Sequence, residues 1–468
     1  MSWNVAAADM PKRHRVPLRG FLMACFLITT SGSAWSEDPR IAMQAAWQAQ
    51  DYEAAIAASQ AVLAQNPDEY LAHALQARVA RIQGNRALAE QAARRAWDAA
   101  DNASQRHEAA RTVALTLFEQ EEYTTAQLWL RRAIQNAPTP EIRAATIRDF
   151  RQVRRVNPWQ IQLTFSVNQS DNVNAGSSED TWQAYFFGSE DTGGIPFELP
   201  ILGQQQALSG TEYIYGGTIT RSLTQIGPWR TEISAGYLAK DIVLSDEARE
   251  QAPTARSSDY DLRQLTLGTT TARTSGRRQH TFDGELSYVG FGGEHLSTGL
   301  RLGYTQTQAI NQGLAWKSGG AVSRALREDR HISSSWRKEL STGPIKQIGN
   351  SIWLGEALIF DVTSDSNNVA RDGWSLQTRW VQTEPATLGA RLSAGLEYGV
   401  TTFDSGFFGA AEARRDEKMR ANVAAVFSDF DLYGFSPSLE ISHTRTNSNV
   451  TLYTYDDTSV VLGIKSAF

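Results

Sequence analysis

The sequence has very few groups that could cross-link it. Cys25 is the single cysteine among 468 residues, so no intramolecular disulfide can form. The seven histidines are scattered, with no pair at metal-ligand spacing, and a structural metal site would lack further thiols to complete it. The folded chain must therefore be held together by packing or by a closed hydrogen-bonded sheet.

Long hydrophobic runs are scarce as well. Mean hydropathy is −0.38, and apolar residues make up 41% of the chain. A bundle of transmembrane helices needs several apolar runs of roughly 20 residues, which this composition excludes. A transmembrane β-barrel is compatible with the composition, because its strands are only half apolar.

One apolar stretch lies near the N-terminus, at residues 21–30. Small residues follow it, with Ala-Trp-Ser at 34–36 as a cleavage site. This layout predicts a secretory signal peptide over residues 1–36, whose cleavage would remove Cys25. Met10 is an alternative start, and a short membrane anchor is the competing interpretation. The basic residues that precede the apolar stretch are Lys12, Arg13, Arg15 and Arg19.

Positive charge is in short supply. The formal net charge is −6, and loss of residues 1–36 would remove four basic groups and Asp9, which leaves −9. A mildly acidic chain gives no support for nucleic-acid binding. We therefore expect no nucleic-acid partner.

Catalytic motifs are missing too. The sequence has no P-loop, no H-E-x-x-H and no G-x-S-x-G. Residues 290–293 (Gly-Phe-Gly-Gly) lack the βαβ context of a nucleotide site. Asp171, Asn172 and Asn174 lack the spacing of a calcium loop and are better explained as turn residues. We expect no enzyme, no cofactor and no metal, although a site assembled only in space is left open.

Residues 37–156 contain no lysine and only one glycine, Gly84, and are rich in alanine, glutamine and arginine. Such a composition predicts helices. A repeat runs through it, in which a small residue recurs as Ala55, Ala89 and Ala126, at steps of 34 and 37 residues. This is the tetratricopeptide period, and three copies are about the minimum for a stable stack. The alternative is an ordinary helical bundle.

The predicted repeat domain is a candidate for binding a client protein. Stacked helical repeats offer a concave surface for a peptide or protein. Three residues occupy the same place in the three copies of the repeat and are the candidate client-binding residues: Tyr52, Arg86 and Tyr123. Four arginines at 148–155 precede the first expected strand and are expected to lie around the periplasmic mouth of the domain that follows.

From residue 157 onward the apolar period changes from 3.6 to 2, which predicts strands. Trp159, Ile161 and Leu163 alternate with Gln160 and Gln162, and similar segments recur to the C-terminus. The polar sides predict a wet lumen, whose candidate residues are Arg230, Arg301, Arg379, Arg391 and Glu397. The last strand ends in an aromatic residue, and its apolar face supplies the candidate assembly signal, Leu462, Ile464 and Phe468.

The connections between these segments alternate between short and long. Residues 224–228, 274–277, 341–344 and 384–386 are predicted short turns, whereas 170–209, 241–258 and 403–413 are long. Short turns on one side and long loops on the other are typical of outer-membrane barrels. At roughly 22 residues per strand with its connection, about 14 strands fit. A secreted β-sandwich or propeller is the soluble alternative.

The predicted fold is thus α+β and multidomain, with a signal peptide at 1–36, a periplasmic tetratricopeptide-like domain at 37–156 and an outer-membrane β-barrel at 157–468. This plan resembles the surface lipoprotein assembly modifier (Slam) family. The stretches that carry the resemblance are residues 165–174 (strand and Asp/Asn-rich turn), 414–416 (Arg-Arg-Asp), 435–437 (Phe-Ser-Pro), 445–453 and the final Phe468.

The resemblance implies an outer-membrane translocator that moves or displays client proteins at the cell surface. Its expected partners are a client lipoprotein or secreted ligand-scavenging protein, outer-membrane lipid and the barrel assembly machinery. The runner-up is an exopolysaccharide export porin, which also joins periplasmic helical repeats to a barrel. A plain nutrient porin is a third possibility, for which the helical repeats would have no purpose.

Overall fold

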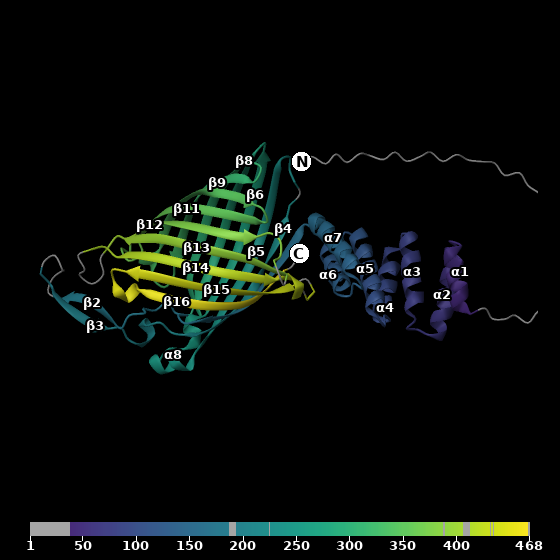
Figure 1. The fold of residues 1–468 in the computed structure, drawn as a ribbon, viewed down its shortest axis with the longest axis horizontal. Helices are drawn as coiled ribbons and strands as arrows, with labels where there is room; N and C mark the ends of the chain where they lie inside the picture. The colour runs from purple at the N-terminus through teal and green to yellow at the C-terminus, as the bar shows by residue number, and fades with distance from the viewer. Residues whose placement is uncertain are drawn as a thin grey trace, which may run out of the picture.

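The computed structural model describes residues 38–468 apart from 187–192, 224, 387–388, 406–411, 431, 434 and 467–468. The predicted signal peptide, residues 1–36, lies outside the described residues. The described chain has two parts, a row of helices and a β-barrel, and the row projects from one end of the barrel (Figure 1).

Seven helices form the first part, and consecutive helices pack against one another in chain order. They are α1 (Pro39–Gln48), α2 (Tyr52–Gln65), α3 (Tyr70–Ile82), α4 (Arg86–Asp98), α5 (Ala103–Glu119), α6 (Tyr123–Gln135) and α7 (Pro140–Val156). Side-chain caps fix several starts: Asp51 accepts from the Ala54 amide and Asn85 from that of Leu88. None of the helices in the described ranges is long and apolar enough to span a membrane.

The small residues of the predicted repeat are the points of tightest helix packing. Ala55 in α2, Ala89 in α4 and Ala126 in α6 are all fully buried. Each lies in the first turns of the second helix of a pair, where a larger side chain would push the pair apart. The tetratricopeptide-like stack predicted from the 34- and 37-residue steps is confirmed.

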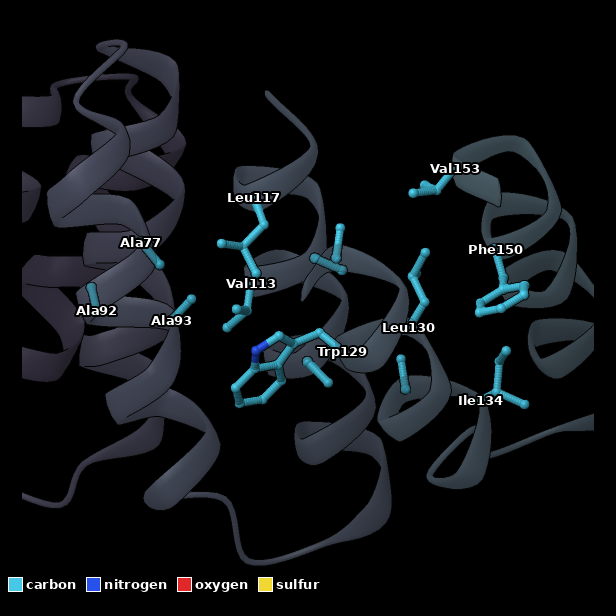
Figure 2. Packing of buried hydrophobic residues seen from close by; sticks show 14 residues of the cluster. Ala77, Ala92, Ala93, Val113, Leu117, Trp129, Leu130, Ile134, Phe150 and Val153 are labelled. Atoms are coloured by element: carbon cyan, nitrogen blue, oxygen red, sulfur yellow. The ribbon is translucent and has the colours of Figure 1, made fainter. Parts of the chain in front are cut away.

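The largest core cluster of the helices has buried residues from every helix from α3 to α7 (Figure 2). Trp129 sits in it, with its ring edge-on to Trp97 at 5.5 Å between centroids and the Arg132 guanidinium 4.2 Å from the ring centroid. In the next cluster, the buried Tyr70 hydroxyl donates to Glu108 at 3.0 Å, and burial raises the pKa of Tyr70.

Trp129→Ala is expected to cost about 3–5 kcal/mol of stability, because it removes a large buried ring and leaves a cavity. The measurement is the loss of helical circular dichroism of the full chain in detergent as urea rises. Leu128→Ala is the matched control, since Leu128 is its neighbour but 57% exposed, and it should change stability by less than about 0.5 kcal/mol. Equal losses for both variants would contradict this packing.

Fourteen antiparallel strands close into a barrel, as the sequence predicted, in the order β1-β16-β15-β14-β13-β12-β11-β10-β9-β8-β7-β6-β5-β4. β2 (Thr181–Phe186) and β3 (Ile195–Pro200) form a separate hairpin in the loop after β1. The barrel strands are β1 (Trp159–Ser170), β4 (Gly210–Ser222), β5 (Trp229–Leu244), β6 (Leu262–Ser275), β7 (Arg278–Phe291), β8 (Glu294–Asn311), β9 (Leu314–Arg327), β10 (Ser335–Ile348), β11 (Ser351–Ser364), β12 (Arg371–Gln382), β13 (Ala390–Phe403), β14 (Arg415–Phe427), β15 (Phe435–Ser448) and β16 (Tyr455–Ser466).

The outer surface of the barrel is an apolar band. Leu163, Leu340 and Leu462 are each about 60% exposed, and similar residues recur on every strand. So much exposed apolar surface is unfavourable in water but suits the hydrocarbon of a membrane. Exposed tryptophans border the band at both strand ends, as an interfacial girdle does: Trp159, Trp316 and Trp353 on the helix side and Trp336 and Trp374 on the far side.

The connections differ between the two ends of the barrel. On the helix side, three hairpins turn through two residues each, with Gly276, Gly313 and Gly349 in the left-handed region. On the far side lie the long segments 171–209 and 245–261 (Figure 1). The far side also has one tight turn, at 292–293. The asymmetry expected of an outer-membrane barrel is present.

One predicted turn is wrong. Residues 341–344 (Ser-Thr-Gly-Pro) lie within β10, not between strands. Pro344 stands opposite Trp316 in the β9 ladder, whereas the β11 ladder passes from Thr342 to Ile345 without a pair at Gly343 or Pro344. Because proline has no N–H, it interrupts one ladder while the strand continues.

Candidate functional site

The barrel closes where its first strand meets its last, and this seam is short. Among the described residues β1 and β16 pair only from Phe165–Ile464 to Ser170–Ser459, which is six pairs. Every other seam of the barrel has eleven to fourteen. The shortfall lies on the helix side.

The two strands separate before either ends. Lys465 and Ser466 stay paired with β15, opposite Ser436 and Phe435, but have no partner on β1. On the other side, residues 159–164 stay paired with β4 alone. The seam is therefore open at its helix end within the described part of the chain.

The hydrogen-bond alternation shows which backbone groups line this opening. The Ser222 amide donates to the Pro158 carbonyl at 2.7 Å, so even-numbered residues of β1 turn their N–H and C=O toward β4. In an antiparallel ladder the odd residues then face the other way. Trp159 N–H is capped by Asn157 Oδ1 at 3.0 Å. The N–H and C=O of Leu163 therefore face the open seam, and the described part of β16 does not pair with them.

A cavity of about 830 Å³ occupies the opening. We call it the seam groove. Its lining includes Gln162 and Thr164 on the lumen side of β1 and Ile161 and Leu163 on the lipid side, so it passes through the barrel wall. Arginines and a lysine dominate its charge, with one carboxylate: Arg131, Arg154, Arg391, Lys465 and Glu440.

Helix α6 spans the base of the seam groove and contacts both of its sides. Toward β1, the side-chain Nδ2 of Asn157 donates to Gln127 Oε1 at 2.8 Å and to Thr124 Oγ1 at 3.1 Å. Toward β15, Arg131 Nη1 donates to the Tyr433 carbonyl at 2.8 Å, and the Tyr433 amide donates to Gln135 Oε1 at 3.0 Å. One helix thus fixes the start of the first strand and the turn before β15.

Tyr433 holds a strained backbone at this contact. Its φ is +51°, a left-handed conformation that costs a non-glycine residue about 1 kcal/mol or more. The two hydrogen bonds from α6 keep the turn in this form. The Arg131 guanidinium also lies over the Phe435 ring, 4.9 Å from its centroid. The sequence carried no signal for this contact, because the partners lie about 300 residues apart.

The predicted lumen residues differ in their surroundings. Arg301 bridges Asp283 and Glu339 at 2.7 Å each, and Arg337 holds the other oxygen of Glu339 at 2.9 Å. Arg230 pairs with Glu232 at 2.7 Å, and Glu397 with Lys418 at 3.5 Å. Arg391 lines the seam groove, and Arg379 lines a smaller cavity beside Glu356 and Gln377. A transport role for any of them stays a prediction.

Arg301→Met should lower the temperature at which the barrel loses its folded migration in SDS gels. The change leaves Asp283 and Glu339 without their shared cation, and the cost is about 1 kcal/mol because these side chains are partly solvated. Arg379→Met is the matched control, since the described residues offer Arg379 no ion-pair partner. An equal shift in the two variants would refute a stabilising role for the Arg301 bridge.

The predicted client-binding residues are not equally accessible. Tyr52 and Tyr123 stand at helix starts but pack against Trp47 and Phe118, with ring centroids 6.1 and 5.5 Å apart. Arg86 begins α4 and is exposed. Their contact with a client stays a prediction. Of the assembly signal, Leu462 and Ile464 are exposed on the outer face, and Phe468 lies outside the described residues.

Asparagine side chains hold the loop after β1 in its conformation by hydrogen bonds to the loop backbone. Asn172 accepts from the Gly176 amide at 2.8 Å and donates to the Gly176 carbonyl, and Asn174 donates to Gln206 O at 2.8 Å. These are turn contacts, as the sequence favoured. No group of three or more His, Cys, Asp or Glu that could hold a metal occurs among the described residues. In the connection between β9 and β10, the Arg327 guanidinium donates to Asp329, and this contact lowers the pKa of Asp329 to about 2.

Each of the two parts of this chain is similar to solved structures. The TPR2B domain:pHsp70 complex of yeast Sti1 shares 14% identity over 25% of this chain and 90% of its own, with a TM-score of 0.22. A BenF-like porin from Pseudomonas fluorescens shares 8% identity over 66% of this chain and 98% of its own. OccK9 of Pseudomonas aeruginosa shares 10% identity over 65% of this chain and 97% of its own, and the TM-score is 0.35 in both cases. Similarities with TM-scores this low add nothing to the strands and helices already described.

No curated protein matches the sequence. A family model does match residues 358–468, from the middle of β11 to the end of the chain, and its description is surface lipoprotein assembly modifier. The matched residues include β15 and β16, which lie on one side of the seam. The match confirms the resemblance drawn from the sequence: the C-terminal part of this outer-membrane barrel is similar to surface lipoprotein assembly modifiers.

Proposed function

We propose that this chain is an outer-membrane translocator that moves client lipoproteins to the cell surface or displays them there. The observation that carries the proposal is the family match of residues 358–468, which form the closing strands of the barrel. A secreted ligand-scavenging protein is a second kind of client that the same path would serve. The barrel assembly machinery would insert the chain, and outer-membrane lipid would surround its apolar band.

The proposed route follows from the ends of the barrel. The helix row stands on the side of the short turns, which face the periplasm in bacterial barrels. Residues 37–156 would then form a periplasmic domain that presents the client to the barrel formed by residues 157–468. The seam groove lies where these two parts meet, between α6 and β1, so a client held by the helices would reach it first.

The proposal is tested by deleting the gene and labelling tagged lipoproteins on intact cells. We expect one or more lipoproteins to be made and acylated in normal amounts but to lose their reactivity with antibody or external protease. Restoring the full chain should restore the labelling. Unchanged exposure of every lipoprotein, together with failed polysaccharide secretion, would overturn the proposal in favour of an exopolysaccharide export porin.

A further inference from the structure

We propose that the open edge of β1 at Leu163 binds an extended segment of the client as an added β-strand. The inference rests on the proposed function, because it names how that client meets the barrel. It concerns the backbone of one strand and the seam groove beside it. The geometry of this edge makes the assignment.

The edge offers unused hydrogen-bonding groups at membrane depth. No strand in the described ranges pairs with the N–H and C=O of Leu163, and its side chain lies within the outer apolar band. In hydrocarbon, each unsatisfied backbone group costs several kcal/mol. An added antiparallel strand would satisfy both groups. Strand addition of this kind draws its affinity from the main chain, so it tolerates clients of different sequence.

The seam groove has room for such a strand, and its lining indicates which side chains the added strand would carry. Lining residues alternate between the lipid side, with Ile161 and Leu163, and the lumen side, with Gln162 and Thr164. A fitting segment would place apolar side chains outward and polar ones inward. Four cations face one carboxylate, Glu440, whose oxygen also accepts from Asn422 at 3.4 Å. Charge complementarity therefore favours a segment with carboxylates on its inward face.

The contacts of α6 connect both sides of this edge to the helix row. Asn157 joins α6 to the first residue of β1, while Arg131 and Gln135 hold the Tyr433 turn beside β15. The width of the groove is thus set by a helix that belongs to the client-presenting part. A client arriving on the helices would meet a strand edge already held apart from β16.

The first test removes one hydrogen-bond donor from the edge. The client is a tagged lipoprotein whose surface exposure was shown to depend on this chain. Leu163→Pro takes away the N–H that faces the seam while leaving the β4 ladder, which uses the even residues, in place. Surface exposure of the client should fall about tenfold, since the added strand loses a bond in hydrocarbon. Leu163→Ala, which keeps the N–H, should retain exposure, and both variants should migrate as folded barrels.

The second test does not depend on the proline variant folding. Thr164→Cys is paired with single cysteines placed one at a time along the client, and disulfides are trapped in cells. Crosslinks at every second client residue are expected, because side chains alternate across a strand pair. Thr218→Cys on β4, also on the lumen face, is the control and should give none.

Three outcomes would overturn the inference. Crosslinks without a period of two, or equal yields from Thr164→Cys and Thr218→Cys, would mean that the client passes through the lumen instead. Crosslinks between two copies of this chain would assign the edge to self-association. Undiminished display with Leu163→Pro would mean that lipid or water satisfies the edge. In each case the dependence of the client on this chain, which tests the proposed function, would stand unaffected.

Discussion

Deletion of residues 460–468 is expected to abolish insertion of the barrel into the outer membrane. The deletion removes most of β16, which pairs with β15 along its whole length and with β1 over the closed part of the seam. Two strand edges would then face lipid, and each unsatisfied backbone group there costs several kcal/mol. The truncated chain should lose heat-modifiable migration in SDS gels and disappear from the outer-membrane fraction.

The matched control changes the same strand without opening the barrel. Lys465→Ala alters a side chain of the seam groove but leaves the backbone of β16 intact, so insertion should be normal. Normal insertion of the truncated chain would contradict the role of this strand and of its apolar residues, Leu462 and Ile464, in assembly.

Deletion of residues 37–156 should leave the barrel inserted while display of the client falls several-fold. The barrel ladders involve none of these residues, so we expect the barrel to fold without them. The helices do contact the barrel through α6, and their loss would free the Tyr433 turn and the start of β1. The measurement combines heat-modifiable migration with protease accessibility of the client on intact cells.

A double variant separates the contact from the helices themselves. Arg131→Ala with Gln135→Ala removes the bonds to Tyr433 but leaves the repeat stack, and it should reproduce part of the display defect. Arg106→Ala on α5 is the control, because Arg106 is exposed and has no ion-pair partner among the described residues. If the double variant displays the client as well as the unchanged chain does, the contact between α6 and the turn has no part in function.

The architecture could be predicted because it depends on local patterns. A period of two with turn residues between segments indicates strands of a barrel, and 14 of them fit the length. The spacing of Ala55, Ala89 and Ala126 indicates paired helices, because only small residues fit where two helices touch. The error at residues 341–344 has the same origin: proline and glycine resemble a turn locally, yet a barrel strand tolerates Pro344 by giving up pairs on one side.

The seam groove could not be predicted from the same patterns. Alternation shows which face of β1 is apolar but not how far β1 and β16 remain paired, which depends on the stagger of the closed barrel. The contact between Arg131 and Tyr433 joins residues that only the folded barrel brings together. The place of Tyr52 and Tyr123 in the repeat predicts contact with a client, and the structure shows that the same place packs both rings against neighbouring rings.

Transfer of a lipoprotein across a membrane that contains only this chain tests the central claim most directly. Purified full-length chain is reconstituted in lipid vesicles, an acylated and tagged client is offered on the side of the helix row, and a protease is confined to the other side. We predict that the client is cleaved in vesicles with this chain and stays intact in vesicles with a plain porin. Equal protection of the client in both would contradict the claim that this barrel carries lipoproteins to the cell surface.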